Sequence, residues 1–262
     1  MTFRRIVWWI FISVVCGFSF LYPVFRHPPS IVPQPPIQSA ETSIPMPDFS
    51  QYENVVDKKV AFFEYLRPEV ERQNDYIIAL RLQLQAMFND YQSTGTLSSH
   101  DAKRLSWLIE EYNVDDSLSR EQQFSLLLRR VDVIPADLVL VQAANESAWG
   151  TSRFATKGYN LYGLWCFRRG CGFVPKRRNS GADHEVAKFS NLAHATYTYM
   201  RNLNRHNAYK ALRDIRRRLR QNQQPITGIA LSEGLMQYSE RGEDYIIELQ
   251  QMIRVNQEYI SS

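Results

Sequence analysis

The feature that most constrains this chain is an uncharged stretch of 20 residues, from Ile6 to Phe25, directly after Arg4 and Arg5. A helix of that length, at about 1.5 Å rise per residue, crosses the apolar core of a bilayer. The two arginines place its N-terminal end on the cytoplasmic side. We therefore expect residues 1–26 to be a single-pass inner-membrane anchor or a signal. A cleaved signal peptide is the alternative, although no small-x-small cleavage site follows the apolar run.

The next segment, residues 27–47, contains seven of the chain's twelve prolines. Such a sequence favours extended polyproline II backbone, at about 3.1 Å per residue, over a packed core. We interpret it as a linker that holds the remainder of the chain away from the membrane, in the periplasm. A disordered spacer of no set length is the alternative.

Residues 48–130 carry apolar side chains at helical spacing. We expect a helical layer that has no chemistry of its own and packs on a second part, residues 131–262. The expected boundaries are a helix stop near Pro68, another at Gly95, helices over 101–112 and 119–131, and N-caps at Ser99 and Ser119.

Composition limits the partners. Hydrophobic residues make up 44% of the chain, which supports a buried core. The formal net charge is +4 and the isoelectric point is near 8.9, which suits an anionic polymer or a membrane surface. Nucleic acid binding requires a more concentrated basic face, so we predict none.

The stretch from Pro135 to Gly150 is typical of an apolar helix. Pro135 suits the first turn and Gly150 suits the end, which places Glu146 in the last turn. The negative end of the helix dipole and the apolar surroundings both disfavour a charged carboxylate, so the pKa of Glu146 should be raised. A carboxyl group that keeps its proton near neutral pH can protonate a glycosidic oxygen. An exposed glutamate near a helix end is the alternative interpretation.

Residues 161–190 are rich in glycine, basic and aromatic residues, and we expect a small hairpin lobe with short strands near Trp165, Val186 and Phe189. Cys166 and Cys171 bracket a short loop in it. A disulfide, half of a metal site and two unrelated thiols are all open, and export would favour the disulfide. Zinc needs about four ligands, and the sequence has no second cysteine pair.

The run Gln142–Gly150, then Ser152 with Ala155, then Asn160 to Gly163, resembles the glucosaminidase domain signature. That signature has an A-x-x-E-S-x-W/G-G helix end followed by N-L-F-G, and Tyr162 stands here where phenylalanine is usual. The resemblance extends over residues 55–258. It implies a mainly helical α+β fold of lysozyme type with a small β-hairpin lobe.

The resemblance also implies cleavage of the β-1,4 bond after N-acetylglucosamine in peptidoglycan glycan strands. It places the general acid on Glu146 and points to Tyr238 as an aromatic hydroxyl that positions the N-acetyl group or the attacking water. Glu185 is the predicted second carboxylate, with Asp183 as its rival and a substrate-assisted mechanism as the alternative. The side chains expected to line the sugar groove are Trp149, Tyr159, Asn160, Tyr162 and Trp165, with packing in the core as the alternative for the two tryptophans.

Two further patterns receive simpler interpretations. His184-Glu185 lacks the second histidine of a metalloprotease motif, because Lys188 occupies that position. The five histidines of the sequence form no cluster with metal-ligand spacing, so we predict no metal and no cofactor. The run of arginines on one predicted helix is interpreted as a solvated face, with contact to anionic glycan carboxyls or lipid headgroups as the alternative. Those arginines are Arg213, Arg216, Arg217, Arg218 and Arg220.

The sequence therefore predicts a membrane-tethered peptidoglycan hydrolase. Two alternatives remain at this stage. A lytic transglycosylase would cleave after N-acetylmuramic acid and leave a 1,6-anhydro end. An inactive wall-binding scaffold would have no need of a carboxyl group at the end of an apolar helix.

Overall fold

The computed structural model describes residues 35–36, 44–175 and 184–261. They belong to one compact unit, Gln34–Ser262. The predicted anchor at residues 1–26, most of the predicted linker and Asp183 lie outside the described residues. Among the helices that are described, none combines the length and the apolar character that a membrane span requires.

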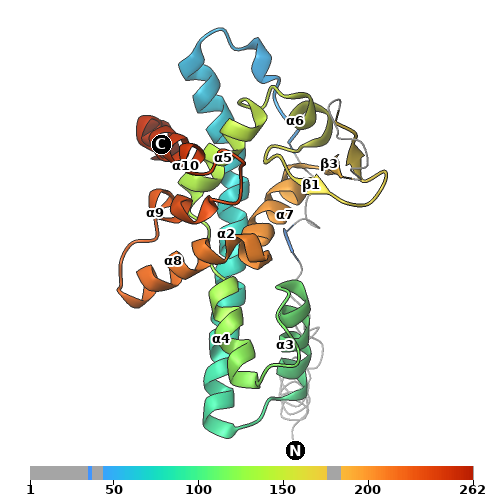
Figure 1. Cartoon of the computed structure of the whole chain (residues 1–262), viewed down its shortest axis with the longest axis vertical. Coiled ribbons are helices and arrows are strands. Elements are labelled where there is room, and N and C mark those ends of the chain that lie inside the picture. The colour runs from blue at the N-terminus through green and yellow to red at the C-terminus, as the bar shows by residue number, and fades with distance from the viewer. Residues whose placement is uncertain (1–34, 37–43, 176–183, 262) are drawn as a thin grey trace, which may run out of the picture. The chain divides into compact units, whose positions relative to one another are not determined.

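The predicted mainly helical α+β architecture is confirmed (Figure 1). The helices are α2 (Val55–Thr94), α3 (Ser99–Glu111), α4 (Arg120–Arg130), α5 (Ala136–Ser147), α6 (Arg153–Gly158), α7 (Leu192–Arg205), α8 (Lys210–Gln221), α9 (Gly228–Ser232), α10 (Glu243–Val255) and α11 (Gln257–Ser261). The 3-10 turns are η2 (Phe49–Gln51), η3 (Asn207–Tyr209) and η4 (Glu233–Leu235), and the strands are β1 (Trp165–Cys166), β2 (Gly172–Phe173) and β3 (Glu185–Ala187).

Helix α2 continues without interruption through Pro68, so the predicted stop at that proline is wrong. A proline inside a helix loses one backbone hydrogen bond and costs about 3 kcal/mol. Pro68 is exposed, where solvent can hydrate the carbonyl group that loses its partner. Buried side chains on both sides of it, among them Leu66 and Val70, fix the helix against the core and offset that cost. The predicted stop at Gly95 is confirmed, since Gly95 caps the helix with a positive φ of 71°.

The start signals of α3 and α4 are close to the prediction. Ser119 caps α4 and forms a capping box with Gln122, as expected. The cap of α3 is Ser98 and not Ser99, and its side chain accepts the N–H of Asp101. The correction of one residue has a simple cause, because two adjacent serines offer the same capping group.

Helix α5 is the centre of the core. From Leu138 to Ala144 every side chain is buried, and the helix contacts α2, α9, α10 and α11. A helix that is buried all round must be apolar all round, which is the pattern seen in its sequence. Because α2 packs on both α5 and α7, and α4 packs on α8, residues 48–130 and 131–261 share one hydrophobic core.

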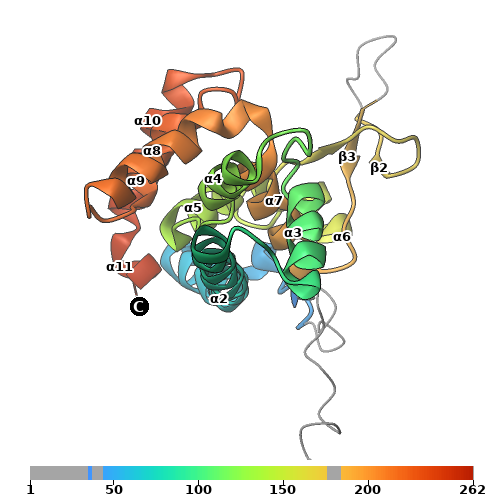
Figure 2. The ribbon, with the colours of Figure 1, turned by 90° about the horizontal axis from the view of Figure 1, so that it is seen from below.

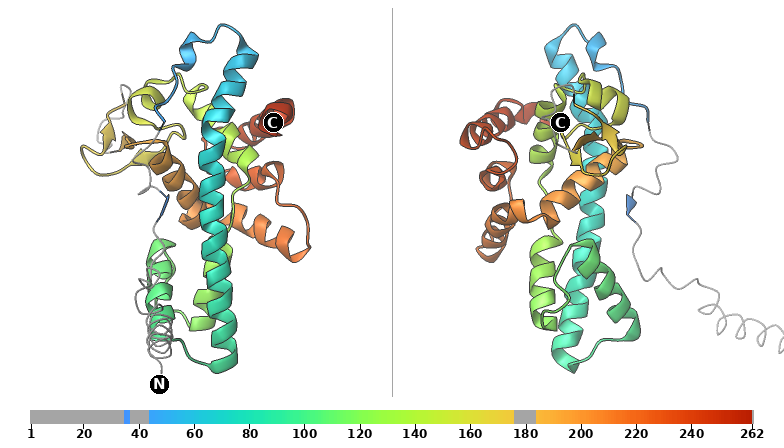
Figure 3. Two further views of the ribbon diagram at one scale, coloured as in Figure 1. Left: turned by 180° about the vertical axis from the view of Figure 1, so that it is seen from behind. Right: turned by 45° about the vertical axis from the view of Figure 1, so that its right-hand side comes forward.

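The remaining elements flank this core on two sides. Helices α8, α9 and α10 lie on one side of α2 and α5, and the small sheet lies on the other (Figures 1 and 2). Figure 3 shows from behind how α2 passes between them. At the end of α5, Tyr245 of α10 and Gly163 of the loop before β1 both lie beside Glu146.

The small sheet has the strand order β1-β3-β2, with both pairs antiparallel. Trp165 pairs with Val186 and Phe173 also pairs with Val186, so β3 is the middle strand. Phe189 lies outside the strands, beyond the end of β3. A disulfide joins Cys166 to Cys171 across the loop after β1, which decides among the three readings of this cysteine pair.

The arginine run on α8 is not a wholly solvated face, and that interpretation is wrong for two of its members. Arg213 is 4% exposed and Arg216 is 1% exposed. Arg213 donates to the carbonyl oxygens of Leu203 and His206. Arg216 donates to three backbone carbonyls and to the side chain of Asn204. Guanidinium groups fit such carbonyl clusters because their five donors form a fixed fork, which a charge pattern in the sequence does not reveal.

Candidate active site

Glu146 lies in the last turn of α5, as predicted, and an unusually tight backbone turn follows it. Pro135 caps the start of the helix, and the helix ends at Ser147, before the expected Gly150. Ala148, Trp149 and Gly150 all have positive φ, with values of 51°, 57° and 77°. The left-handed conformation costs about 1–2 kcal/mol for a residue with a side chain. Ser147 stabilises the turn, since its hydroxyl donates to Ala143 and accepts the N–H of Gly150.

The Oε1 atom of Glu146 is held by a directed chain of hydrogen bonds. The hydroxyl of Tyr245, on α10, donates to Oε1 at 2.8 Å. That hydroxyl accepts in turn from Nε2 of Gln142 at 3.0 Å. The side-chain oxygen of Gln142 accepts from the hydroxyl of Tyr199, on α7. Each group therefore has its donor and acceptor roles assigned, and Oε1 is the final acceptor.

Neutral tyrosines surround this chain. Tyr162 stacks on Tyr199 with ring centroids 4.1 Å apart, and Tyr238 stacks on Tyr245 at 5.6 Å. Tyr209 packs against Tyr238 at 5.9 Å. Burial is the largest cause that raises the pKa of each of these hydroxyls, so all of them stay protonated near neutral pH.

The second oxygen of Glu146, Oε2, lies beside a residue with no side chain. A Cβ atom added to Gly163 would lie 3.0 Å from Oε2, and Gly163 has a positive φ of 65°. Glycine meets both requirements of this position, because it tolerates the backbone conformation and leaves the space beside the oxygen free. The N-L-Y-G segment thus places its glycine at the carboxyl group.

Burial raises the pKa of Glu146. The hydrogen bond from Tyr245 lowers it, the charge of Glu248 raises it and the charge of Arg241 lowers it, but burial prevails. Glu248 and Arg241 form an ion pair with each other at 2.7 Å. The direction agrees with the sequence prediction, and desolvation is its principal cause.

The two predicted partners of Glu146 lie in different surroundings. Tyr238 belongs to the tyrosine cluster, and its hydroxyl donates to the backbone oxygen of Tyr162 at 2.6 Å. Glu185 is 4% exposed, and its two oxygens accept the N–H groups of Gly170 and Gly172 at 2.9 and 2.8 Å. These bonds hold the disulfide loop against β3. A catalytic role for Glu185 stays a prediction, and its hydrogen bonds favour a structural one.

The side chains predicted to line a sugar groove divide into exposed and buried ones. Trp165 is 50% exposed on β1 and contacts His184 edge to face. Tyr159 is half-buried, as is Trp149, whose ring packs against two phenylalanines of α2. Tyr162 is fully buried and pairs with Thr196 through its hydroxyl. Sugar contact stays a prediction for these residues, and exposure favours Trp165.

Asn160 is also buried, at 1% exposure, and its side chain has a clear structural task. Its amide donates to the carbonyl oxygens of Leu164 and Ala187, and its oxygen accepts the N–H of Leu164. These bonds close the loop that carries Gly163 and fasten it to β3. The predicted sugar contact of Asn160 is not favoured by this burial.

Cys166, Cys171 and Glu185 bring potential metal-ligating atoms within 4.8 Å of one another. The sulfurs are joined in a disulfide and the carboxylate accepts two backbone N–H groups. Cysteine binds a metal ion as a thiolate, which a disulfide does not offer. This cluster is accordingly a structural unit of the hairpin lobe.

Sequence reasoning missed Tyr245, Tyr199 and Gln142. A signal for Tyr245 was present, since it recurs seven residues after Tyr238 in an amphipathic stretch. Gln142 lies one turn before Glu146 on the same helix, a spacing that places the two side chains on one face. Tyr199 gives no such signal, because only the packing of α7 against the core brings it to Gln142.

Comparisons with known proteins are consistent with this geometry. A family model described as "Glucosaminidase: Mannosyl-glycoprotein endo-beta-N-acetylglucosaminidase" matches residues 121–258. The chain is 33% identical over 226 residues to "Protein bax" of Escherichia coli (strain K12), covering 86% of this chain and 79% of that protein. No solved structure matches the chain. The matched segment includes Glu146, Gly163, Tyr238 and Tyr245.

Proposed function

The chain belongs to the glucosaminidase family, a family of glycosidase-type enzymes, and from that membership we propose that it hydrolyses peptidoglycan. The bond cleaved is the β-1,4 linkage after N-acetylglucosamine, and Glu146 is the general acid. No cofactor takes part in this proposal. The predicted anchor at residues 1–26 would hold the enzyme on the outer face of the inner membrane, with the catalytic part in the periplasm.

The observation that carries the proposal is the asymmetric environment of the Glu146 carboxyl group. Oε1 already accepts the hydroxyl of Tyr245, so a proton on this group belongs on Oε2. Oε2 lies beside Gly163, where no side chain occupies the space. Burial favours the protonated form. These features support Oε2 as the oxygen that carries the proton in the proposed reaction, since cleavage of a glycosidic bond requires a protonated general acid.

In the proposed reaction, Oε2 of Glu146 gives its proton to the leaving glycosidic oxygen while the bond to the anomeric carbon breaks. Positive charge develops on the sugar ring in the transition state. The departing proton leaves a carboxylate, which the Tyr245 hydroxyl stabilises by its hydrogen bond. Water then attacks the anomeric carbon, with Tyr238 or Glu185 as the assisting group or with the N-acetyl group of the substrate in its place.

The test is the release of reducing ends from purified sacculi by the full-length chain and by Glu146→Gln. Glutamine keeps the size of the side chain and the acceptor for Tyr245 but has no acidic proton. Loss of a general acid lowers the rate by about 10²–10⁴-fold. Glu110→Gln, an exposed glutamate on α3, is the matched control and should retain full activity. Equal activity in Glu146→Gln and the native chain would refute the assignment.

Mass spectrometry of the products separates the two alternatives. New N-acetylglucosamine reducing ends support the proposed hydrolase, whereas 1,6-anhydro ends support a lytic transglycosylase. Binding to sacculi without any released ends supports a wall-binding scaffold. The buried hydrogen-bond chain that ends on Glu146 favours the enzyme, because a binding surface gains nothing from a protonated carboxyl group.

A further inference from the structure

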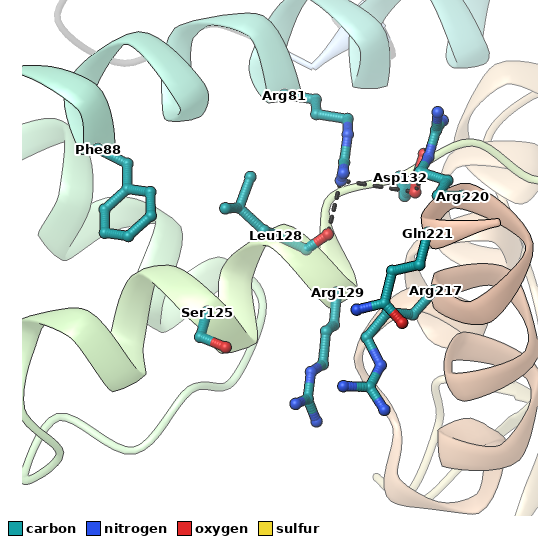
Figure 4. A pocket seen from close by; sticks show the side chains of 9 residues that line it. All are labelled: Arg81, Phe88, Ser125, Leu128, Arg129, Asp132, Arg217, Arg220 and Gln221. Atoms are coloured by element: carbon teal, nitrogen blue, oxygen red, sulfur yellow. Dashed lines mark hydrogen bonds and ion pairs between the residues drawn. The ribbon is translucent and has the colours of Figure 1, made fainter. Parts of the chain in front are cut away.

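A second concave site lies away from Glu146, between α2, α4 and α8 (Figure 4). It is a pocket of about 340 Å³ with a polar and an apolar side. The residues that line it are Arg81, Phe88, Ser125, Leu128, Arg129, Asp132, Arg217, Arg220 and Gln221. None of the tyrosines around Glu146 belongs to it, so it is separate from the candidate active site.

The charges of this lining are strongly unbalanced, with four arginines and one aspartate. The aspartate, Asp132, is already fully engaged. Arg220 binds it through two nitrogens, at 2.6 and 2.5 Å, and Arg81 lies 3.5 Å from it. A further arginine that does not line the pocket, Arg216, lies 3.7 Å from the same carboxylate. Asp132 therefore has no capacity left to neutralise other cations.

Two guanidinium groups remain in excess. Arg129 comes from α4 and Arg217 from α8, and their side chains extend in the same direction along the pocket in Figure 4. Within the described part of the chain, neither has an ion pair with a carboxylate. The Nε atom of Arg217 is buried and has no hydrogen-bond partner there. Asp214 lies close enough for both charges to lower its pKa, but it forms its ion pair with Lys210.

The other lining residues have a different character. Phe88 of α2 and Leu128 of α4 present apolar surface, Ser125 of α4 adds a hydroxyl, and Gln221 of α8 adds an amide beside Arg217. Two neighbouring guanidinium groups repel each other unless an anion lies between them. Planar guanidinium forks match the oxygens of a carboxylate or a phosphate, and such pairs are often bidentate. The apolar side chains would contact the carbon skeleton that carries the anionic group.

We propose that this pocket binds an oxyanion, a carboxylate or a phosphate, between Arg129 and Arg217. The proposal goes beyond hydrolysis and does not depend on it, since the pocket shares no residue with the Glu146 site. Two sources carry this chemistry in the surroundings expected for the chain. One is the carboxylates of peptidoglycan stem peptides, and the other is free phosphate.

Isothermal titration calorimetry on the full-length chain, in a non-ionic detergent, tests the proposal with two probes. One is inorganic phosphate, and the other is the stem tripeptide L-alanyl-γ-D-glutamyl-meso-diaminopimelate, which has no sugar and so does not report on the active site. We expect the native chain to bind at least one probe. Arg129→Gln with Arg217→Gln should weaken that binding by about tenfold or more.

Arg218→Gln is the matched control, since Arg218 is exposed on the same helix and does not line the pocket. It should change the affinity less than twofold. The double variant keeps the Asp132 network, because only the backbone of Arg129 takes part in it. Its thermal unfolding and its reducing-end release are measured in parallel, and the single variant Arg217→Gln provides a second reading should the double variant fail to fold.

The outcomes are distinct. Binding that is lost in the double variant and retained in Arg218→Gln supports the pocket, and the probe that binds identifies the source of the anion. Absence of binding for both probes at millimolar concentration overturns the proposal. So does equal binding by the double variant and the control. Activity on sacculi reports separately on the proposed function, so failure of one proposal is not mistaken for failure of the other.

Discussion

Glu146 and Asp132 are both withdrawn from solvent, and their surroundings drive their pKa values in opposite directions. Burial raises the pKa at each site. At Glu146 one tyrosine hydroxyl opposes burial, and the pKa ends above its usual value. At Asp132 a bidentate bond from Arg220 and the charges of two further arginines outweigh burial, and the pKa ends below it.

The difference is consistent with separate tasks for the two carboxyl groups. The Tyr245 hydroxyl is neutral and stabilises a charge on Glu146 less than a guanidinium group would, as the proposed proton transfer requires. Guanidinium groups keep Asp132 charged near neutral pH, and that charge joins α2 and α8 to the segment between α4 and α5. Desolvation alone therefore does not predict protonation, since the charges of the bonding partners decide whether burial prevails.

The largest effect is expected for Asp132→Asn, which removes the charged carboxylate of this pair of sites. Arg216 is buried and would lose its only nearby carboxylate among the described residues. Removing one partner of a buried ion network costs about 3–5 kcal/mol, so the free energy of unfolding should fall by that amount in chemical denaturation. Reducing-end release per folded molecule should stay unchanged.

Asp116→Asn, an exposed aspartate in the loop before α4, is the control for Asp132→Asn and should lie within about 0.5 kcal/mol of the native chain. An Asp132→Asn protein that unfolds at the same denaturant concentration as this control would show that the arginines are stable without their carboxylate. In that event the ion pairs of Asp132 would contribute nothing measurable to the free energy of unfolding.

A second effect is expected in Tyr245→Phe. The variant loses the donor to Oε1 of Glu146, a type of bond worth about 1.5–3 kcal/mol when one partner is charged. We expect kcat/KM to fall by about tenfold or more. The alkaline limb of the pH–rate profile should also move to higher pH, because the lost hydrogen bond lowers the pKa of Glu146 in the native chain.

Tyr91→Phe is the matched control for Tyr245→Phe. Tyr91 donates to Glu121 at 2.9 Å on the surface, so it removes the same kind of bond outside the site. Its activity and pH profile should equal those of the native chain. If Tyr245→Phe has lower rates than the native chain but the alkaline limb of its pH–rate profile stays at the same pH, the hydroxyl does not act through Glu146.

Part of this structure was accessible from the sequence because the signals are local. The capping box at Ser119, the apolar run of α5 and the left-handed stop at Gly95 each depend on residues within one or two turns. The position of Glu146 in the last turn follows from the same run. The direction of its pKa shift was also accessible, because the apolar composition of α5 predicts its burial.

Other features depend on packing between distant segments. Pro68 continues a helix because the core on both sides of it holds α2 in place, and no local rule reports that. The arginines of α8 are spaced like a solvated face, yet Arg216 reaches carbonyl groups more than 80 residues away in the sequence. Tyr199 joins Glu146 through Gln142 only once α7 is in place.

A smaller effect is expected in Gly163→Ala, which tests the free space beside Oε2. The new methyl group would lie 3.0 Å from that oxygen, and the positive φ adds backbone strain of about 1 kcal/mol. Gly95→Ala is the control, since Gly95 has a similar φ of 71° with nothing within 4 Å of the added Cβ. Both variants should lose similar stability in thermal unfolding, but only Gly163→Ala should lose activity. Equal activity in the two would show that substrate does not use the space beside Oε2.

The smallest effect is a difference in how stability depends on pH, and its sign separates the two carboxyl groups. Because the folded-state pKa of Glu146 is raised, its contribution to stability is complete below the unfolded value, near 4.5, and is lost as the pH rises through the folded value. Glutamine does not ionise, so Glu146→Gln should match the native chain at acid pH and exceed it in Tm at neutral and alkaline pH.

Asp132 gives the opposite sign. Its folded-state pKa is lowered, so its contribution is present above the unfolded value, near 3.8, and is lost as the pH falls through the folded value. The Tm difference between the native chain and Asp132→Asn should therefore shrink only in strong acid, whereas the difference for Glu146→Gln should grow towards alkaline pH. Each kcal/mol corresponds to about 2–4 °C in a domain of this size, so scanning calorimetry at several pH values resolves both. If the Tm of Glu146→Gln differs from that of the native chain by the same amount at every pH, the carboxyl group titrates alike in the folded and unfolded states. The raised folded-state pKa, on which the proposed proton on Oε2 depends, would then be absent.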